Sequence, residues 1–304
     1  MNPYHSEPFW LKARLFVNRA MEPGEVRSED ERRLWAALAL EQLAKWALAE
    51  TSPVLVVDPV SDGGSQLFKA LGLQEGSKNV TAQAKTVFAR CAQIYRPFDE
   101  REAMKIAGTR NEYLHGPDMD LLRLPDFVWW PKYWSLMNVL LTSHQRQVGD
   151  FVGLSRVSEV ENHLAKNNQR IKEQYEAALG AAQRNLKRHE SGMMTTSEKI
   201  RWDSRMMNDL SFLYAEPEEC PACGAIGTVQ SDYADSKEIS WIDEGDGPAR
   251  YPIVEVTFSP DYFSCRNCHL ILDDYELVKQ AGLDTPVTIE TDEEPFAEGE
   301  YGND

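Results

Sequence analysis

Hydrophobic positions in the first half of the chain recur every three or four residues, the period of an amphipathic α-helix. The clearest case lies between residues 28 and 50, where apolar residues at 35, 38, 39, 43, 46 and 47 fall on one stripe. Ser28 with Glu31 has the spacing of a capping box at the start of this stretch, and Thr195 with Glu198 has the same spacing later in the chain. Turn-forming residues separate this stretch from similar ones. We therefore predict helices over residues 8–19, 28–50, 65–71, 78–95, 99–115 and 129–148, with an extended segment at 54–57.

The pattern changes after residue 150. Residues 155–190 are polar apart from a narrow apolar stripe, which predicts a long helix packed against one partner helix. That partner is either a second copy of the chain or an intrachain helix predicted over residues 197–214. Short strand-like runs then appear at 228–230, 238–242, 251–258 and 270–272, followed by a short helix at 275–280.

These patterns predict a mainly α protein in four parts. Residues 1–150 form a helical domain, 151–215 a helical arm and 216–283 a small β-rich domain. Residues 284–304 hold eight acidic side chains and neither Lys nor Arg, so we expect a disordered tail. The tail either increases solubility or imitates nucleic acid and covers a basic site.

Four of the five cysteines form two C-x-x-C pairs, Cys220 with Cys223 and Cys265 with Cys268. Each pair offers two thiolates from one tight turn, and four thiolates complete the closed tetrahedral shell of structural Zn²⁺. The 41 residues between the pairs exceed the common spacing of about 15 to 20. We therefore predict a zinc ribbon with an enlarged β-hairpin.

Three other roles for the cysteines and for His269 are weighed against a four-cysteine zinc site. His269 could replace a cysteine as ligand, but it directly follows Cys268 and fits better beside the knuckle. A redox C-x-x-C is disfavoured because two pairs occur in a ribbon pattern. Cys91 stands alone on the apolar face of a predicted helix, so we expect a buried, inert thiol. Gly224 suits the left-handed turn of the first knuckle.

A second chemical group lies at the end of the helix predicted over residues 99–115. Arg110, Asn111 and His115 fall within six residues, directly before Gly116 and Pro117. Arginine is a permanent planar cation that suits a phosphate, and histidine exchanges a proton near neutrality. On a helix, Asn111 and His115 share a face and Arg110 is their neighbour. All three side chains can therefore point into one cleft.

Local signals place this group on the helix. Asp99 and Glu102 have the spacing of a capping box that begins a helix, while Gly116 and Pro117 end one. His115 then lies in the last turn, where the helix dipole favours its protonated form. Tyr113 and Leu114 are free to face a core.

This stretch resembles the Arg-x4-His signature of the HEPN superfamily, which here reads Arg110, Asn111 and His115. The resemblance covers residues 8–148 and implies that the helices of residues 1–150 form an up-and-down bundle. It implies a homodimer with one composite site that cleaves RNA without a metal. His115 and its symmetry mate would act as general base and acid, Arg110 would stabilise the phosphorane, and Asn111 would hold His115 or the phosphate. The product would end in a 2′,3′-cyclic phosphate.

The resemblance also draws attention to the helix over residues 28–50. In HEPN proteins the second helix often sends a polar side chain toward the active site. Glu41, Gln42 and Lys45 lie off the apolar stripe, so one of them would contact Arg110. The alternative is that all three lie on a solvated face.

Charge works against RNA binding over part of the chain only. The formal net charge is −17, yet residues 206–304 hold 4 of the 32 basic and 23 of the 49 acidic side chains. The predicted bundle is nearly neutral and can bind a single strand if its cations converge. One basic cluster, a predicted RNA track or a solvated face, consists of Lys187, Arg188, His189, Lys199, Arg201 and Arg205.

Two other functional hypotheses remain. Arg110 and His115 could form ion pairs on an ordinary helix, in a non-catalytic dimer whose zinc ribbon docks a protein partner. Nucleotidyl transfer is disfavoured, because the chain has no Gly-rich phosphate loop. The absence of a membrane-length apolar run and of a signal peptide predicts a cytoplasmic protein. The HEPN resemblance implies a toxin or anti-phage effector that acts on RNA, with a regulatory protein or antitoxin as a further partner.

Overall fold

The computed structural model describes residues 4–75, 79–115, 124–204, 212–243 and 250–291. The chain is mainly helical, with small antiparallel β-sheets and a cluster of four cysteines in its C-terminal part. It divides into unit 1, Met1–Asn168, and unit 2, Gln169–Asp304. Among the described residues, no helix is both long and apolar enough to cross a lipid bilayer.

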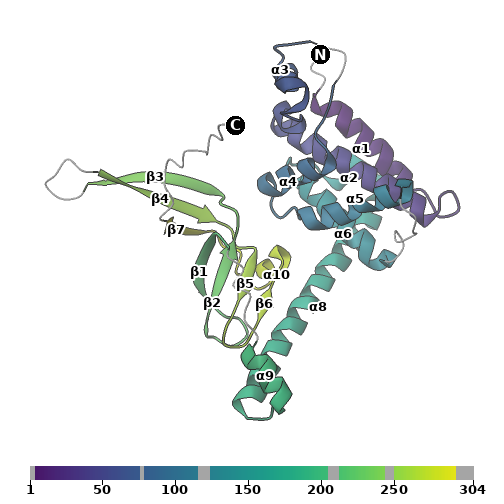
Figure 1. Cartoon of the computed structure of the whole chain (residues 1–304). Helices are drawn as coiled ribbons and strands as arrows, with labels where there is room; N and C mark the ends of the chain where they lie inside the picture. Colours follow the sequence, from purple (N-terminus) through teal and green to yellow (C-terminus); the bar gives the residue numbers. More distant parts are fainter. Residues whose placement is uncertain (1–3, 76–78, 116–123, 205–211, 244–249, 292–304) are drawn as a thin grey trace. The chain divides into compact units, whose positions relative to one another are not determined.

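Unit 1 is organised around one central helix, α2 (Glu29–Thr51), which contacts α1, α4, α5 and α6 (Figure 1). Because these helices surround α2, it is buried on almost every side. Alanine occupies many of its positions and lets the neighbouring helices approach closely. The other helices are α1 (Ser6–Ala20), α3 (Ser65–Ala70), α4 (Ala84–Ile94), α5 (Glu100–His115), α6 (Asp126–Thr142) and α7 (Val148–Val152). Three short 3₁₀ turns are η1 (Pro53–Val56), η2 (Ser61–Gly64) and η4 (Leu154–Arg156).

The central helix differs from its prediction in two ways. A single apolar stripe was expected, but Arg33, Glu41 and Lys45 are also buried. Helices that are enclosed on all sides lose the polar face that a stripe assumes. In addition, the capping box predicted at the start of α2 is absent. The Ser28 side chain makes no cap hydrogen bond, and the Glu31 carboxylate instead binds Arg27 and the Trp35 indole.

Several other boundaries in unit 1 were predicted wrongly. Residues 54–57 were expected to be extended, but Pro53–Val56 forms the turn η1, because a proline at the first position favours a helical turn. Helix α4 begins six residues after its expected start. Helix α6 begins three residues before its expected start and ends six residues before its expected end, and α7 was not predicted. Helices α1, α3 and α5 agree with the pattern within two residues.

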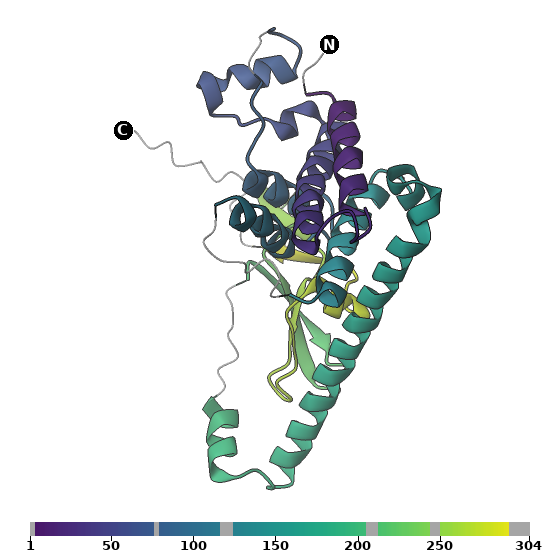
Figure 2. The same ribbon diagram turned by 90° about the vertical axis from the view of Figure 1, so that its right-hand side faces the viewer.

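Unit 2 combines the C-terminal part of α8 (Val157–Glu190) with α9 (Thr196–Ser204), α10 (Tyr275–Gln280) and two sheets. One sheet has the strand order β1-β2-β5-β6 and the other β3-β4-β7. Figure 2 shows α9 folding back beside the end of α8. The strands are β1 (Tyr214–Glu219), β2 (Ile226–Ser231), β3 (Ser236–Asp243), β4 (Arg250–Phe258), β5 (Tyr262–Ser264), β6 (Ile271–Leu272) and β7 (Val287–Thr291).

The apolar stripe of α8 packs on two cores of its own chain and not on the helix expected over 197–214. Its first part enters the core of unit 1 through Val160 and Leu164. Within unit 2, Tyr175, Leu179 and Leu186 pack on the core that contains the cysteines. The β-rich domain therefore covers the stripe that we had assigned to a second helix.

Two predicted segments of unit 2 end differently. The helix expected over 197–214 is described only as α9, residues 205–211 lie outside the described residues, and Tyr214 already begins β1. Residues 284–304 were expected to form a disordered tail, but Val287–Thr291 forms β7 and pairs with β4. Alternation of Val287 and Ile289 with Thr288 and Glu290 is a strand signal that the acidic composition obscured. Residues 292–304 lie outside the described residues.

Candidate functional site

The motif helix α5 starts where the sequence predicted. The Asp99 carboxylate accepts hydrogen bonds from the backbone N–H groups of Arg101 (2.7 Å) and Glu102 (3.1 Å). Glu102 does not complete the capping box, since its carboxylate binds Lys105 (2.6 Å) and Lys132 (2.7 Å). The helix extends to His115, and the predicted stop at residues 116–117 lies outside the described residues.

Arg110 belongs to a charged cluster that links α5 to the central helix. One oxygen of the Glu41 carboxylate accepts a hydrogen bond from the Arg110 guanidinium, and the other accepts one from Lys45 Nζ at 2.7 Å. The side chains of Glu41 and Lys45 are 11% and 8% exposed, whereas Arg110 is 26% exposed. The sequence alternative in which one of Glu41, Gln42 and Lys45 contacts Arg110 is therefore confirmed, and a solvated face is wrong for Glu41 and Lys45.

The electrostatics of the Lys45–Glu41–Arg110 cluster follow from this geometry. Both carboxylate oxygens accept a hydrogen bond, so the buried anion is paired twice. A buried charge is tolerated when it is paired and hydrogen-bonded. Arg110 has the most exposed side chain of the three.

The remaining motif residues are placed by the backbone alone. Asn111 and His115 both lie on α5, four residues apart, and His115 is about 7.5 Å further along the helix axis than Arg110. Their side chains lie outside the described residues. The tyrosine between them was expected to face a core, but Tyr113 is 39% exposed. It therefore stands on the open side of α5.

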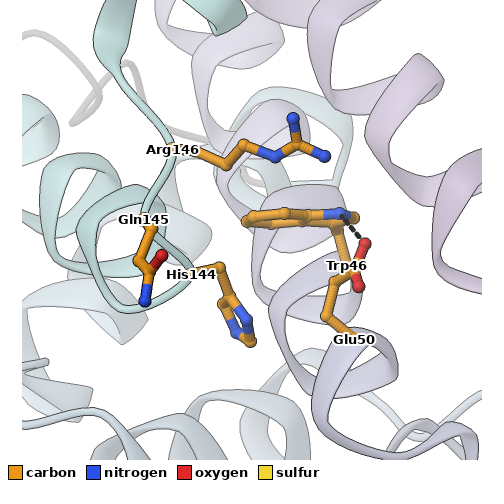
Figure 3. Close-up of a pocket in the computed structure, with 5 residues that line it drawn as sticks. All are labelled: Trp46, Glu50, His144, Gln145 and Arg146. Atoms are coloured by element: carbon orange, nitrogen blue, oxygen red, sulfur yellow. Dashed lines mark hydrogen bonds between the residues drawn. The ribbon is translucent and has the colours of Figure 1, made fainter.

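Unit 1 also has a small polar pocket, of about 280 Å³, which sequence reasoning missed (Figure 3). It is lined by Trp46, Glu50, His144, Gln145 and Arg146. Trp46 donates its indole N–H to Glu50 at 3.2 Å, and the His144 ring meets the Trp46 ring edge-on with centroids 5.1 Å apart. Burial lowers the pKa of His144, which makes it neutral at pH 7. Among the described side chains of the motif, Arg110 does not line this pocket.

Unit 2 places the four predicted metal ligands together. Their sulfur atoms all lie within 4.8 Å of one another. Cys220 Sγ is 3.5 Å from Cys268 Sγ, and Cys223 Sγ is 3.7 Å from Cys265 Sγ. These separations exceed a disulfide bond, and they match the roughly 3.8 Å between sulfurs of a tetrahedral site with metal–sulfur bonds of about 2.3 Å. The four thiols can hold one metal ion and are compatible with structural zinc.

The two knuckles share one backbone geometry. Cys220 N–H donates to the Ala225 carbonyl and Gly224 N–H donates to the Cys220 carbonyl, each at 2.9 Å. The same two bonds recur around Cys265, where His269 takes the place of glycine. Gly224 has φ of 71° and His269 has φ of 58°, so the left-handed turn was predicted correctly.

His269 accepts this backbone conformation in a stacked environment. The His269 ring stacks on the Trp202 ring of α9, with centroids 3.9 Å apart. The Trp202 ring also stacks on the His189 ring, with centroids 5.1 Å apart. In the described part of the chain, the metal-ligand group consists of the four cysteines without His269. This histidine lies beside the knuckle, as expected, and connects it to α9.

The electrostatics of the four cysteines favour a bound cation. Burial raises the pKa of Cys220 to about 11 and raises the pKa of Cys268 as well. Burial acts in the same direction on Cys223, but hydrogen bonds, first the one from Asn267 at 3.4 Å, lower its pKa to about 7. Four adjacent thiolates repel one another, and a divalent cation removes that repulsion. Asn267, which the sequence did not single out, supports the shell as a donor to sulfur.

No family model, curated protein or solved structure matches this chain. Its function must therefore be inferred from its own residues.

The predicted basic cluster is partly used for internal contacts. Arg188 forms an ion pair with Glu198 at 2.9 Å, and His189 stacks on Trp202. Glu198 also completes a capping box with Thr195, as its spacing predicts. Arg205 lies outside the described residues. These contacts reduce the number of cations that an RNA strand could use.

Proposed function

We propose that this chain is a metal-independent endoribonuclease of the HEPN type, with zinc in a purely structural role. The observation that carries the proposal is the buried Glu41 carboxylate, which binds Arg110 from a neighbouring helix. An arginine that is simply hydrated at the surface does not need a buried carboxylate to hold its guanidinium in place. Fixing a guanidinium before substrate arrives removes the entropic cost of orienting it.

The proposed reaction is transesterification of RNA. The 2′-hydroxyl attacks the adjacent phosphorus, the 2′-O–P bond forms, and the bond from phosphorus to the 5′-oxygen breaks. One His115 takes the proton from the 2′-hydroxyl, and His115 of a second copy protonates the departing 5′-oxygen. Arg110 stabilises the negative charge of the phosphorane. The products are a 2′,3′-cyclic phosphate and a 5′-hydroxyl, and DNA is not a substrate.

Cleavage of RNA in EDTA tests this proposal directly. Wild-type protein should cleave a single-stranded RNA, and Arg110→Ala and His115→Ala should each lower the rate at least 100-fold. Arg101→Ala is the matched control, because Arg101 is an exposed arginine on the same helix. Zinc content is measured in every sample so that loss of the metal is not mistaken for loss of catalysis.

The chemistry has its own signature. Mass spectrometry should find a 2′,3′-cyclic phosphate at the cleaved end, and a 2′-deoxy nucleotide placed at that position should block cleavage. Full activity of the Arg110→Ala protein would refute the proposal. In that case the Glu41–Arg110 contact only joins two helices, and a binding role for the metal domain becomes the better reading.

The biological role proposed here follows from the resemblance of the motif. An RNA-cleaving HEPN protein would act as a toxin or anti-phage effector in the cytoplasm, under control of a regulatory protein or antitoxin. Induced expression in bacteria tests this role, since wild-type protein should arrest growth and the His115→Ala protein should not.

A further inference from the structure

Strand β3 (Ser236–Asp243) forms one edge of the three-stranded sheet β3-β4-β7. In the described residues it pairs with β4 alone, over eight positions. An edge strand presents backbone N–H and C=O groups that another strand can bind, and natural proteins shield long edges. The free side of β3 is therefore a place where a further strand can add.

Two large apolar side chains on β3 are exposed. Ile239 is 44% and Trp241 is 53% exposed. Ile239 stands opposite Val254 of β4 and so shares a face with it. Val254 and Val256 on that face are buried, at 3% and 0% exposure. The apolar face thus continues from the buried centre of the sheet to its open edge, where it ends in water.

The opposite face of this sheet is acidic. Glu238, Glu255 and Glu290 stand side by side across the three strands. Like charges in directly opposed positions repel, so this face is suited to water and not to a second sheet stacked on it. Association through the sheet is thereby directed to the edge.

We propose that a second copy of the chain binds along β3, antiparallel, with the twofold axis at Ser240. The two sheets then form one continuous sheet of six strands. In this register Ile239 of each copy lies opposite Trp241 of the other.

The other registers match poorly. A twofold axis at Ile239 leaves Trp241 opposite Lys237, and an axis at Trp241 leaves Ile239 without an apolar residue opposite it. Only the axis at Ser240 gives both exposed apolar side chains, Ile239 and Trp241, an apolar residue opposite them. Lysine on an edge strand normally discourages pairing, and the Lys237 ammonium lies over the Tyr214 ring of its own chain, 5.6 Å from the centroid.

The expected affinity is modest. In this register seven of the eight residues of β3, 237–243, pair across the axis, which places the interface at the small end of specific contacts, below about 1,200 Å². A dissociation constant on the order of 10 μM is therefore expected. This pairing rests on β3 alone and does not depend on the proposed ribonuclease activity.

Disulfide trapping tests the register in the full-length, zinc-loaded protein. Ser240→Cys places a thiol on the twofold axis, with Cα atoms roughly 4.5 to 5.5 Å apart, which a disulfide can bridge. Ser236→Cys is the matched control, because Ser236 is also exposed and on the same face of β3. Its symmetry mate lies about 26 Å away. Mild oxidation should link the Ser240→Cys protein into dimers and leave the Ser236→Cys protein monomeric.

Sedimentation of the wild-type protein should show a dimer that dissociates on dilution, and Trp241→Lys should raise the dissociation constant at least tenfold with zinc content unchanged. A monomer at every concentration would overturn the proposal. So would a dimer in which Ser240→Cys does not cross-link, or equal cross-linking of both variants. The RNA assay is read separately, so loss of cleavage with intact cross-linking refutes only the proposed function.

Discussion

Replacing the buried carboxylate of the Lys45–Glu41–Arg110 cluster should destabilise unit 1 strongly. Glu41→Gln keeps the shape of the side chain and removes its charge. Lys45, with a side chain that is 8% exposed, is then left as a buried cation without a counter-charge. Arg110 is 26% exposed and regains part of its hydration.

The size of the effect follows from the burial of each partner. Breaking a fully buried ion pair costs about 3 to 5 kcal/mol, and the partial exposure of Arg110 reduces that range here. We expect Glu41→Gln to lower the free energy of unfolding by about 2 to 3 kcal/mol. Adding Lys45→Met to this variant should recover part of the loss, because the unpaired cation is removed.

Glu102 offers a matched control. It also joins two cations in unit 1, but Lys105 is 63% exposed and Lys132 is 24% exposed. Glu102→Gln should therefore cost no more than about 1 kcal/mol. Six of the eight tryptophans belong to unit 1, so urea unfolding followed by tryptophan fluorescence reports mainly on this unit.

The comparison of the two variants decides the reasoning. Equal costs for Glu41→Gln and Glu102→Gln, within about 0.5 kcal/mol, would show that burial does not amplify the Glu41 contacts. A larger cost in Glu41→Gln combined with unchanged RNA cleavage would keep the stability argument and remove the catalytic one.

Two further outcomes are expected from the metal site and from buried imidazoles. The purified protein should contain one zinc ion per chain by mass spectrometry, and the Cys223→Ser protein should lose it. The Cys91→Ser protein should keep its zinc, because Cys91 lies buried in unit 1. Zinc retained by the Cys223→Ser protein would contradict the four-sulfur shell. Burial lowers the pKa values of His144 and His163 in the folded state. As the pH falls, these histidines are therefore protonated in the unfolded chain before they are protonated in the folded one. Their contribution to the free energy of unfolding should be fully present above about pH 6.5 and should decrease as the pH drops below that value. His144→Gln should flatten that dependence in urea unfolding at pH 5 and pH 7.5, and an unchanged slope would show that His144 does not contribute.

Local signals in the sequence predicted what depends on neighbouring residues. The knuckles around Cys220 and Cys265 were predicted in ligands and backbone turn, because a C-x-x-C pair determines its own geometry. The start of α5 at Asp99 and the capping box at Thr195 are also local. Each depends on contacts within about four residues, and sequence spacing describes such contacts well.

Features that depend on distant packing were less accessible. The apolar stripe of α8 predicted burial but could not name the partner, since a stripe looks alike whether a helix or a sheet covers it. Glu41 was recognised only as one of three polar residues, because its role requires Arg110 from a helix much later in the chain. The pocket around His144 gave no signal, since its residues come together only through the fold.

The contacts of helix α8 determine where this protein can be divided into expression fragments. Val160 and Leu164 complete the helical core, while Tyr175 and Leu179 complete the core around the cysteines. A cut at the start of α8 would expose the first core, and a cut near its end would expose the second. Expression fragments that keep both hydrophobic interiors whole must therefore be separated within residues 165–174.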